Sequence, residues 1–558
     1  MLHYAAMVET AKQCRGSELR AEVVILGGGL AGLTLALQLR QRLPQLHITV
    51  LERRSDPAPA AAFKVGEASV EIASHYFAEV LGLRAHLDTC HLRKFGFRFF
   101  FSHDSSDLPS VTELGQSTFL PTPTWQIERG IFENFLCERV REQGIGLEQG
   151  AVVRAVALSG GDADHAVRFE LNGVEHEIAA RWVIDATGRA GFLKRQLGLH
   201  RPNAHDANAA WFRIAARIDV GQWGGDARWQ QRCQPPARWL STNHLCGPGY
   251  WVWLIPLASG SHSVGIVADP AVHPLDTFDS FAKALEWLRR HQPRLAADLE
   301  GKHALLQDFH TCRHFSHDCK QVFSSARWAL TGEAGVFLDP FYSPGGDYIA
   351  IANTYITELV ARDRNGEPLS LYATLYERLF RSFYDSTLVL YTGQYPLFGD
   401  AEVMPLKVLW DYTYYWGVLC QLYFQQRLAD LPLLGGLRAE LMACMELNAA
   451  VQKVLLQWAG HNTPCNPPQL LDQAAVDWFV ELNRGLGDRL SDAQVTARLR
   501  DNLALLATLA RDLLGEAQRA HPGVDGSELL RLAARLAPAA PQAGPGCGSL
   551  FARLRIAV

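Results

Sequence analysis

The sequence predicts an α/β protein in which an α/β domain is interleaved with an antiparallel β-sheet and followed by a helical C-terminal region. Three observations support this fold class. A glycine-rich turn follows a short apolar run at residues 21–26, which is typical of a buried parallel strand. Runs rich in β-forming residues occupy 210–219 and 261–269. Farther along, apolar side chains recur at three- and four-residue spacing over 495–514, as on one face of a helix.

The first strand, turn and helix carry a dinucleotide-binding pattern. Gly27, Gly29 and Gly32 form GxGxxG, and the next strand, 48–51, ends at Glu52. The first glycine permits the tight turn, the second lets the backbone approach a pyrophosphate, and the third lets helix and strand pack closely. A carboxylate at the end of the second strand accepts from a ribose hydroxyl and repels a 2′-phosphate. This Rossmann-like unit therefore favours FAD or NAD over NADP.

Two later segments select FAD. Residues 182–188 and 328–334 each read as a strand that ends in a tight glycine turn, and both resemble the returning strands of FAD-dependent oxygenases. In the second, Gly332 is followed by Glu333 where those proteins carry aspartate, so the carboxylate acceptor is kept. Arg129 matches the arginine at a helix start near the flavin; a surface salt bridge is the alternative for it.

Two further motifs identify a family. Residues 250–256 read YWVWLIP, and residues 337–345 read FLDPFYSPG. With the glycine-rich turn, in this order, they resemble the GxGxxG, WxWxIP and FxxPxxSxG signatures of the flavin-dependent halogenases. Tryptophan halogenases carry a glutamate where this chain has Tyr342. The resemblance is therefore closer to the phenol- and pyrrole-type branch, or to a divergent halogenase-like branch.

The resemblance implies a reaction and a catalytic residue. In that family, reduced FAD and O2 form a flavin hydroperoxide, a halide (chloride or bromide) attacks it, and hypohalous acid crosses a tunnel to a lysine beside an electron-rich aromatic ring. Residues 92–99 resemble the KxGxxF stretch, which places Lys94 at that lysine. Burial among the following phenylalanines would lower the pKa of this amine. An ordinary strand lysine with its head in water is the alternative.

The resemblance also assigns the residues around the flavin. Residues 64–69 resemble a loop that straps the flavin, with Glu67 beside the cofactor. Trp251 and Trp253 share one strand face and are expected beside the passage to the substrate, although two core tryptophans would fit the same pattern. The residues expected at the cofactor are Gly27, Gly29, Leu30, Ala31, Gly32, Glu52, Arg53, Glu67, Arg129, Gly332, Glu333, Pro340 and Gly345. The residues expected at the halide are Ser343, Gly345 and Gly346. Pro344 has no N–H and removes one donor from this halide site.

The motifs also suggest boundaries along the chain. We expect an N-terminal tail at 1–20, a helical C-terminal region or lid at 363–536 and a flexible tail at 537–558. The portions of the FAD-binding domain are expected at 21–84, 130–204 and 326–362. The portions of the substrate-side β-sheet are expected at 85–129 and 205–325.

Composition excludes several classes of partner. The net charge is −5 without a long basic block, which argues against nucleic acid or an anionic membrane. No run reaches the roughly 18 to 20 apolar residues of a membrane span. Eleven scattered cysteines without a CxxC pair indicate a reducing compartment, so we expect a cytoplasmic protein. His310, Cys312 and His314 alternate but lack recognised zinc spacing, so no metal is expected.

Three functions remain open on the sequence. The first is an FADH2-dependent halogenase acting on a small aromatic substrate, free or tethered to a carrier protein. Its reduced flavin would come from a separate NAD(P)H-dependent flavin reductase, because no second nucleotide-binding pattern is visible. The second is a flavin monooxygenase or dehydrogenase on the same scaffold, suggested by Tyr342 and Pro344. The third is a flavin-binding paralogue without catalytic activity.

Overall fold

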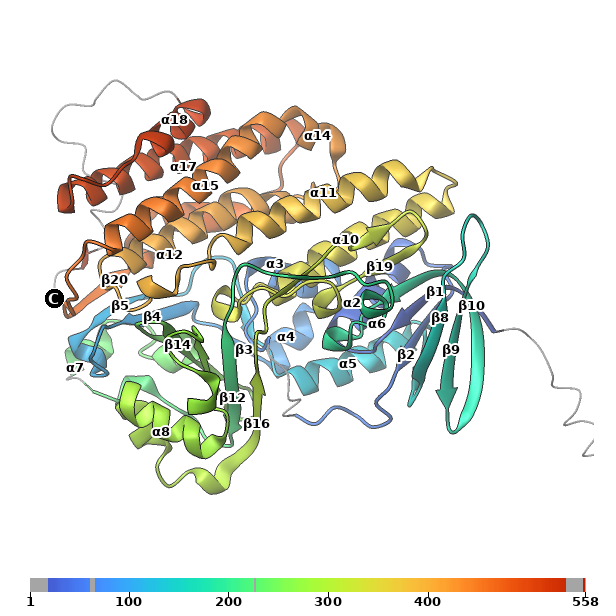
Figure 1. The fold of residues 1–558 in the computed structure, drawn as a ribbon, viewed down its shortest axis with the longest axis horizontal. Coiled ribbons are helices and arrows are strands. Elements are labelled where there is room, and N and C mark those ends of the chain that lie inside the picture. Colours follow the sequence, from blue (N-terminus) through green and yellow to red (C-terminus); the bar gives the residue numbers. More distant parts are fainter. Residues whose placement is uncertain (1–18, 61–65, 225–226, 538–554, 557–558) are drawn as a thin grey trace, which may run out of the picture.

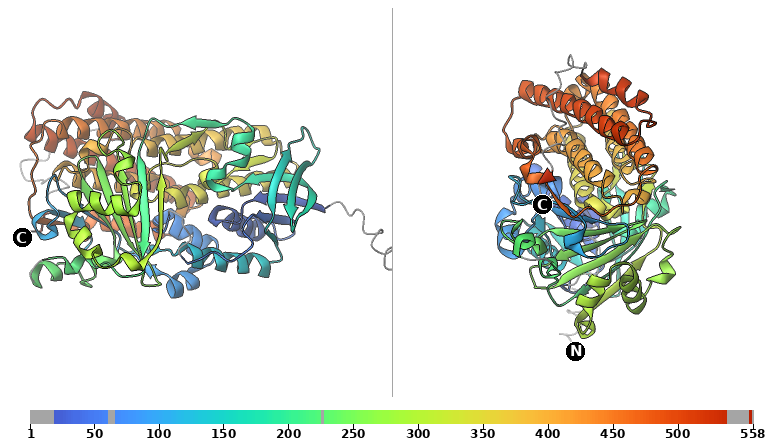
Figure 2. Two further views of the ribbon diagram at one scale, coloured as in Figure 1. Left: turned by 60° about the horizontal axis from the view of Figure 1, so that its bottom comes forward. Right: turned by 90° about the vertical axis from the view of Figure 1, so that its left-hand side faces the viewer.

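The computed structural model describes residues 19–60, 66–224, 227–537 and 555–556. Within these ranges two large β-sheets lie beneath a layer of long helices (Figure 1). The α/β fold class predicted from the sequence is confirmed, with its second sheet and its helical C-terminal region. The right-hand view of Figure 2 shows the C-terminal helices gathered on one side of the molecule. None of the helices in the described ranges is long and apolar enough to cross a membrane.

The first sheet is built on parallel strands. Its main order is β18-β19-β10-β1-β2-β7. The strands are β1 (Leu19–Leu26), β2 (Ile48–Glu52), β7 (Gly146–Gln149), β10 (Val174–Asp185), β18 (Phe323–Ser324) and β19 (Trp328–Leu330). Leu26 pairs with Leu51 of β2 and with Asp185 of β10, and Asp185 pairs with Leu330 of β19. The carboxyl ends of four strands therefore meet at one edge, where α/β proteins bind their ligands.

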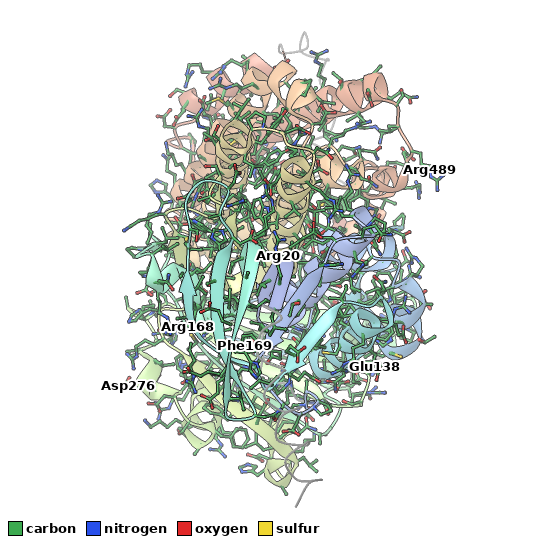
Figure 3. All side chains as sticks on the ribbon, turned by 90° about the vertical axis from the view of Figure 1, so that its right-hand side faces the viewer. Arg20, Glu138, Arg168, Phe169, Asp276 and Arg489 are labelled. Atoms are coloured by element: carbon green, nitrogen blue, oxygen red, sulfur yellow. The ribbon has the colours of Figure 1, made fainter. Side chains whose placement is uncertain are left out.

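Helices cover this sheet, which explains its apolar strands. Residues 23–26 of β1 are fully buried, as expected for a parallel strand covered on both faces. The covering helices include α2 (Leu30–Arg42), α5 (Arg129–Glu142) and α10 (Gly345–Arg364). Two antiparallel strands, β8 (Val152–Ala157) and β9 (His165–Leu171), extend from β10. Figure 3 looks onto this end of the molecule, where Phe169 of β9 is buried and the neighbouring Arg168 is exposed.

The second sheet runs in the order β16-β12-β15-β14-β13-β4-β5-β20-β21. Its strands are β4 (Phe97–Phe101), β5 (Thr112–Gly115), β12 (Asn208–Ile214), β13 (Thr242–Gly247), β14 (Tyr250–Pro256), β15 (His262–Ala268), β16 (Leu306–Cys312), β20 (Gln469–Asp472) and β21 (Arg555–Ile556). Most pairs are antiparallel, but β13 pairs with β4, and β20 with β5, in parallel. The sheet is thus mixed, because β4 and β20 are joined to their partners by long crossovers rather than hairpins.

The chain termini depart from the expected boundaries. Residues 1–18 lie outside the described residues, and β1 already includes Leu19 and Arg20. The region at 363–536 is not purely helical, because it contributes β20 to the second sheet. Most of the expected tail at 537–558 also lies outside the described residues, but Arg555 and Ile556 form β21 against β20. A four-residue strand carries too little alternation to stand out among helices.

Long amphipathic helices form the C-terminal layer. They are α11 (Leu369–Leu388), α12 (Val403–Tyr414), α15 (Arg438–Ala459), α17 (Asp492–Ala520) and α18 (Ser527–Leu536). A capping box formed by Ser491 and Gln494 begins α17, and Val495, Leu499 and Leu506 continue its buried stripe. A π-helical turn, η11 (Tyr415–Cys420), follows α12 directly.

The remaining elements are short. The other helices are α3 (Glu71–His75), α4 (Arg84–Cys90), α6 (Phe192–Gln196), α7 (Ala227–Gln231), α8 (Phe281–His291), α9 (Pro293–Leu299), α13 (Gln421–Phe424), α14 (Leu431–Gly436) and α16 (Asp477–Arg484). Two small ribbons pair β3 (Leu92–Arg93) with β6 (Trp125–Gln126), and β11 (His200–Pro202) with β17 (His317–Cys319).

Candidate functional site

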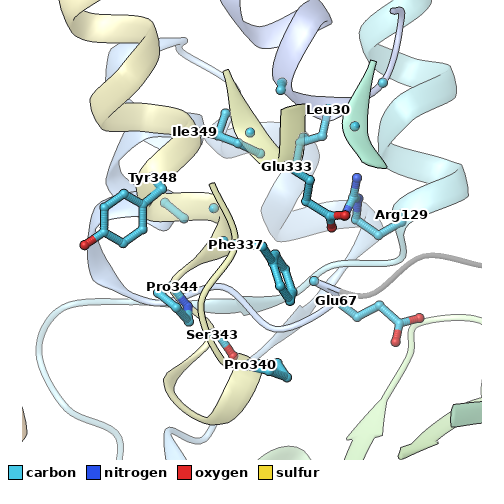
Figure 4. Close-up of a pocket in the computed structure, with 18 of the residues that line it drawn as sticks. Leu30, Glu67, Arg129, Glu333, Phe337, Pro340, Ser343, Pro344, Tyr348 and Ile349 are labelled. Atoms are coloured by element: carbon cyan, nitrogen blue, oxygen red, sulfur yellow. The ribbon is translucent and has the colours of Figure 1, made fainter. Parts of the chain in front are cut away.

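A large cavity of about 830 Å³ lies where the carboxyl edge of the first sheet faces the second sheet. Its wall combines the glycine-rich loop, the ends of β2, β10 and β19, the segment at 337–346 and the inner face of β14. Figure 4 shows part of this wall, with Leu30, Arg129, Glu333 and Ser343 among the labelled side chains. Segments that are distant in the sequence thus converge on one site.

The glycine-rich loop has the geometry of a phosphate cradle. Gly27 has φ +104°, and a Cβ there would lie 2.5 Å from the carbonyl oxygen of Ala186. A Cβ on Gly32 would lie 2.0 Å from the carbonyl oxygen of Gly27. Helix α2 begins after Gly29 without a side-chain cap, so its first N–H groups are available to an anion. These features fit the pyrophosphate of FAD.

Glu52 lies beneath this loop. Its Oε2 accepts from the N–H of Gly28 at 2.6 Å, and its Oε1 accepts from the N–H of Arg54 at 2.8 Å. The carboxylate is thereby oriented at the cavity wall, where it could accept from a ribose hydroxyl. Arg53, the next residue, also lines the cavity. Sequence spacing alone located Glu52, because it belongs to one local βαβ unit with the glycine-rich turn.

Two other expected cofactor residues, Arg129 and Glu333, line the cavity and are paired with other side chains of the protein. Arg129 begins α5 and donates to Glu133 Oε1 at 2.7 Å while lining the cavity. Glu333 follows Gly332, which has φ +61°, and it accepts from Arg189 Nε at 2.9 Å. A carboxylate still faces the cavity at this position, but Arg189 holds one of its oxygens. No sequence pattern indicated Arg189, which is 144 positions away from Glu333.

Glu67 forms a buried ion pair that no sequence pattern predicted. Its Oε1 accepts from Arg213 Nε at 2.7 Å, and Arg213 also contacts Asp308. Both carboxylates and the guanidinium are almost fully buried. Burial raises the pKa of Glu67, while the nearby Arg213 acts in the opposite direction. The pair fixes the loop around residues 66–69 to β12 of the second sheet.

The segment that carries the expected halide residues forms a tight turn into α10. Ser343 has φ +53°, and its N–H already donates to the carbonyl oxygen of Pro340 at 2.9 Å. Pro344 precedes the helix and has no N–H. Gly345 and Gly346 occupy the first turn of α10, which has no side-chain cap, and both line the cavity. Two amides at a helix N-terminus therefore remain for an anion.

The two tryptophans of β14 present their rings to the cavity. Trp251 Nε1 donates to the hydroxyl of Tyr395 at 3.2 Å, and Trp253 Nε1 donates to Ser263 Oγ at 3.1 Å. Tyr395 in turn donates to Asp339 Oδ2 at 2.7 Å. Tyr395 belongs to the C-terminal region, so that region helps to orient a residue beside the flavin site.

Lys94 lies just behind the cavity wall, in the loop before β4. Its side chain is buried, and its Nζ donates to the carbonyl oxygen of Ser69 at 3.0 Å. The Nζ also lies 3.4 Å from the centre of the Phe97 ring. Burial lowers the pKa of Lys94 to about 7, while Glu71 and Asp347 act to raise it. A good fraction of this amine is therefore uncharged near neutral pH.

Two smaller cavities lie beside the large cavity on the side of Lys94 and share wall residues with it or with each other. The first, of about 60 Å³, is lined by Phe97 and by several tyrosines, and it shares Pro344 and Tyr348 with the large cavity. The second, of about 20 Å³, is lined by Lys94 and Glu71. The two smaller cavities share Val70 and Tyr412. We call these the tyrosine cavity and the lysine cavity.

The alternating histidines and cysteines do not gather into a site. Within the described ranges, no three His, Cys, Asp or Glu side chains are grouped as metal ligands. Instead, His314 Nδ1 contacts Asp206 at 2.8 Å, and His317 Nε2 contacts the carbonyl oxygen of Glu333 at 3.1 Å. His310 lines the large cavity.

Comparison with known proteins agrees with this geometry. Residues 20–256 match the family model described as an FAD binding domain. The flavin-dependent halogenase chlA of Dictyostelium discoideum is 25% identical over 435 residues, which cover 72% of this chain and 70% of the relative. The chain is a homologue of the flavin-dependent halogenases. The resemblance stated from the motifs is thus confirmed, and the protein is an enzyme of the flavin-dependent halogenase type that binds FAD.

Two further halogenases are similar to this chain. A brominase of Pseudoalteromonas luteoviolacea (strain 2ta16), named for 1H-pyrrole-2-carbonyl on a peptidyl-carrier protein, is 26% identical over 337 residues, covering 58% of this chain and 73% of that protein. The crystal structure of halogenase PltM has a TM-score of 0.64 at 17% identity and covers 87% of this chain and 96% of its own. The PltM likeness supports the fold of this flavin-dependent halogenase homologue.

Proposed function

We propose that the protein is an FADH2-dependent halogenase that delivers hypohalous acid to an electron-rich aromatic ring at Lys94. The series of three cavities is the main support for this proposal. The cavities follow one another from the glycine-rich loop to the buried amine of Lys94, and neighbouring cavities share wall residues such as Pro344 and Tyr348. Reduced FAD, when bound, supplies with O2 the oxidising power that converts chloride or bromide into hypohalous acid.

The residues of this chain have distinct roles in the proposal. The glycine-rich loop and α2 hold the pyrophosphate, Glu52 orients the ribose, and the amides of Gly345 and Gly346 hold the halide. Trp251 and Trp253 wall the flavin side and keep the substrate away from it. The Lys94 ammonium donates to hypohalous acid, and its uncharged amine can react with it, so a pKa near 7 makes both forms available.

The substrate and the source of reduced flavin complete the proposal. A separate NAD(P)H-dependent flavin reductase supplies FADH2, and the tyrosine cavity receives a small aromatic ring. The brominase of P. luteoviolacea is named for a ring on a carrier protein. A carrier-bound ring is therefore tested beside free rings.

A second candidate is a flavin monooxygenase or dehydrogenase. Pro344 favours it, because this residue removes an amide donor from the halide turn. The two candidates differ in how the mass of the product changes. A halogenase adds bromine, a monooxygenase adds oxygen, and a dehydrogenase removes two hydrogens.

The test is mass spectrometry of products from phenol, pyrrole and indole, free and carrier-bound, with regenerated FADH2, O2 and bromide. We expect a paired bromine isotope pattern with the native chain and none with Lys94→Ala, which should still bind and oxidise FADH2. Lys283→Ala is the matched control, because Lys283 is exposed on α8 and pairs with Asp279. Full bromination by Lys94→Ala would contradict the assigned role of the lysine.

A further inference from the structure

A hydrogen bond joins the halide turn, residues 340–346, to the C-terminal helical layer. Tyr342, the residue directly before Ser343, donates from its hydroxyl to Asp411 Oδ2 at 2.8 Å. Asp411 lies on α12, 69 positions farther along the chain. The turn that carries the expected halide residues is therefore anchored by a side chain from a different region of the fold.

Asp411 belongs to a buried group of polar side chains between α12 and α15. Lys407 Nζ donates to Asp411 Oδ2 at 2.9 Å and to Gln452 Oε1 at 2.6 Å. Gln452 Nε2 donates to Asp411 Oδ1 at 2.8 Å. Lys407, Asp411 and Gln452 are each at most 2% exposed. Both carboxylate oxygens therefore have donors, and Tyr342 supplies one of them from outside the two helices.

A buried ion pair of this kind is weak evidence for stability. The attraction between two buried charges often only offsets the cost of removing them from water, and apolar side chains can serve the fold equally well. A better-attested use of such a pair is to specify one arrangement of the elements around it. Lys407 also balances the charge of Asp411, so this carboxylate can anchor the turn without repelling an anion bound there.

The halide turn requires an anchor at this point. Ser343 has φ +53°, a left-handed conformation that residues with a side chain rarely adopt. Such a conformation persists only where the surrounding structure holds it. Before the turn, Asp339 Oδ1 accepts from the Phe341 N–H at 2.9 Å. Tyr342 is the last side chain before Ser343, and its contact with Asp411 fixes the turn at its strained residue.

The hydroxyl of Tyr342 remains a donor over the working pH range. Burial, together with the charge of Asp411, raises the pKa of this hydroxyl well above its usual value. A hydroxyl that donates to a carboxylate forms a charge-assisted hydrogen bond, which is roughly twice as strong as a bond between neutral groups. The anchor is therefore both permanent and directional.

We propose that Asp411 is a positioning residue for the halide site. Through the hydroxyl of Tyr342 it holds Ser343 and the first amides of α10 in the arrangement that binds chloride or bromide. This inference rests on the proposed function and assigns part of its halide site to the C-terminal layer. Asp411 acts on the halide only through Tyr342.

Bromide binding without turnover tests this role. Bromide is titrated into the full chain loaded with oxidised FAD, without reductant or aromatic ring, and is followed by calorimetry and by flavin absorbance. Tyr342→Phe removes only the hydroxyl that reaches Asp411. We expect this variant to bind bromide about three- to tenfold more weakly, which is part of the usual effect of a hydrogen bond to a charged group. Its FAD affinity should be unchanged.

Tyr355→Phe is the matched control. Tyr355 lies farther along α10, and its buried hydroxyl donates to the carbonyl oxygen of Leu428 at 3.1 Å. The substitution therefore removes one buried tyrosine hydroxyl from the same helix without touching the halide turn. This variant should bind bromide as the native chain does.

A second variant removes the partner of Tyr342 instead. Lys407→Met, Asp411→Val and Gln452→Leu together replace the polar group between α12 and α15 by apolar side chains. This triple variant should lose bromide affinity by the same factor as Tyr342→Phe. Adding Tyr342→Phe to it should cause no further loss, because both changes break the same contact.

Four outcomes would overturn the positioning role. They are native bromide affinity in Tyr342→Phe, an equal loss in Tyr355→Phe, and losses that multiply when Tyr342→Phe is combined with the triple variant. The fourth is a lower midpoint of urea unfolding in the triple variant with native bromide affinity, which would assign the polar group to the fold alone. Tyr342→Phe decides the question by itself if the triple variant does not fold.

The two levels of the proposal fail separately. Bromide binding that is equal in the native chain and in Tyr342→Phe would reject the positioning role and keep the halogenase. Absence of bromide binding to the native chain would reject the halide site of the proposed function, and this inference with it. A bromide site that depends on Tyr342, without brominated product under turnover, would keep the positioning role and reject halogenation.

Discussion

The Nζ of Lys94 donates to the carbonyl oxygen of Ser69 across 3.0 Å, and Ser69 itself lines the large cavity. One residue thus lies between the flavin site and the buried amine. The loop that carries Ser69 is fixed to the second sheet by the ion pair of Glu67 with Arg213. The position of the lysine relative to the flavin therefore depends on contacts between two sheets.

Gly32→Ala should abolish FAD binding. The new Cβ would lie 2.0 Å from the carbonyl oxygen of Gly27, so the loop must open and the cradle is lost. The bound flavin is measured from the visible absorbance of the purified protein. Gly515→Ala is the control, because a Cβ at this position in α17 meets nothing within 4 Å. It should retain FAD and gain up to about 1 kcal/mol in stability. Normal FAD content in Gly32→Ala would contradict the assigned role of the loop.

Pro344→Ser should strengthen halide binding. The substitution adds an N–H next to Gly345 and Gly346 at the start of α10, where an anion is favoured. We expect the KM for bromide to fall several-fold with little change in the KM for the ring, measured by initial rates over a range of bromide concentrations. Pro293→Ala, at the first turn of α9, should leave both constants unchanged. An unchanged bromide KM in Pro344→Ser would mean that halide binds elsewhere.

The sequence predicted those parts of the site that depend on local patterns. Gly27, Gly32 and Glu52 belong to one βαβ unit, and their spacing alone indicates a nucleotide site. Lys94 and Trp251 were located only by resemblance, because a lysine or a tryptophan on a strand has no distinctive pattern. Their roles remain predictions.

The residues that sequence reasoning missed make contacts between distant segments. Arg213 reaches Glu67 across 146 positions, and Tyr395 reaches Trp251 across 144. Glu71 is close to Lys94 in sequence, but a single glutamate at the start of a short helix reads as an ordinary charged residue. Only its burial sets it apart.

Lys94→Met should change how stability depends on pH. The folded-state pKa of about 7 lies below the unfolded value of 10.5, so between these values the unfolded chain binds the extra proton and stability rises with pH. The variant lacks this contribution. Its stability advantage over the native chain should therefore shrink from pH 8 to pH 10, by up to about 1.4 kcal/mol per pH unit.

Urea unfolding of both proteins at several pH values measures this difference. Asp347, with a folded-state pKa of about 8 against 3.8, acts in the opposite direction but below this window. The tyrosines and cysteines are common to both proteins and cancel in the comparison. Parallel pH profiles for the two proteins would mean that Lys94 is charged in the folded state.

Arg213→Met should destabilise the protein by about 3–5 kcal/mol, because it leaves Glu67 and Asp308 as buried carboxylates without their cation. The free energy of unfolding in urea measures this loss. The double variant Arg213→Met with Glu67→Gln should recover part of the loss, since only one unpaired carboxylate remains. Arg290→Met is the control: Arg290 is exposed and pairs with Glu286, so the change should be within about 0.5 kcal/mol. A loss that small in Arg213→Met would show that the buried pair contributes little, and that other contacts fix the loop which carries Ser69.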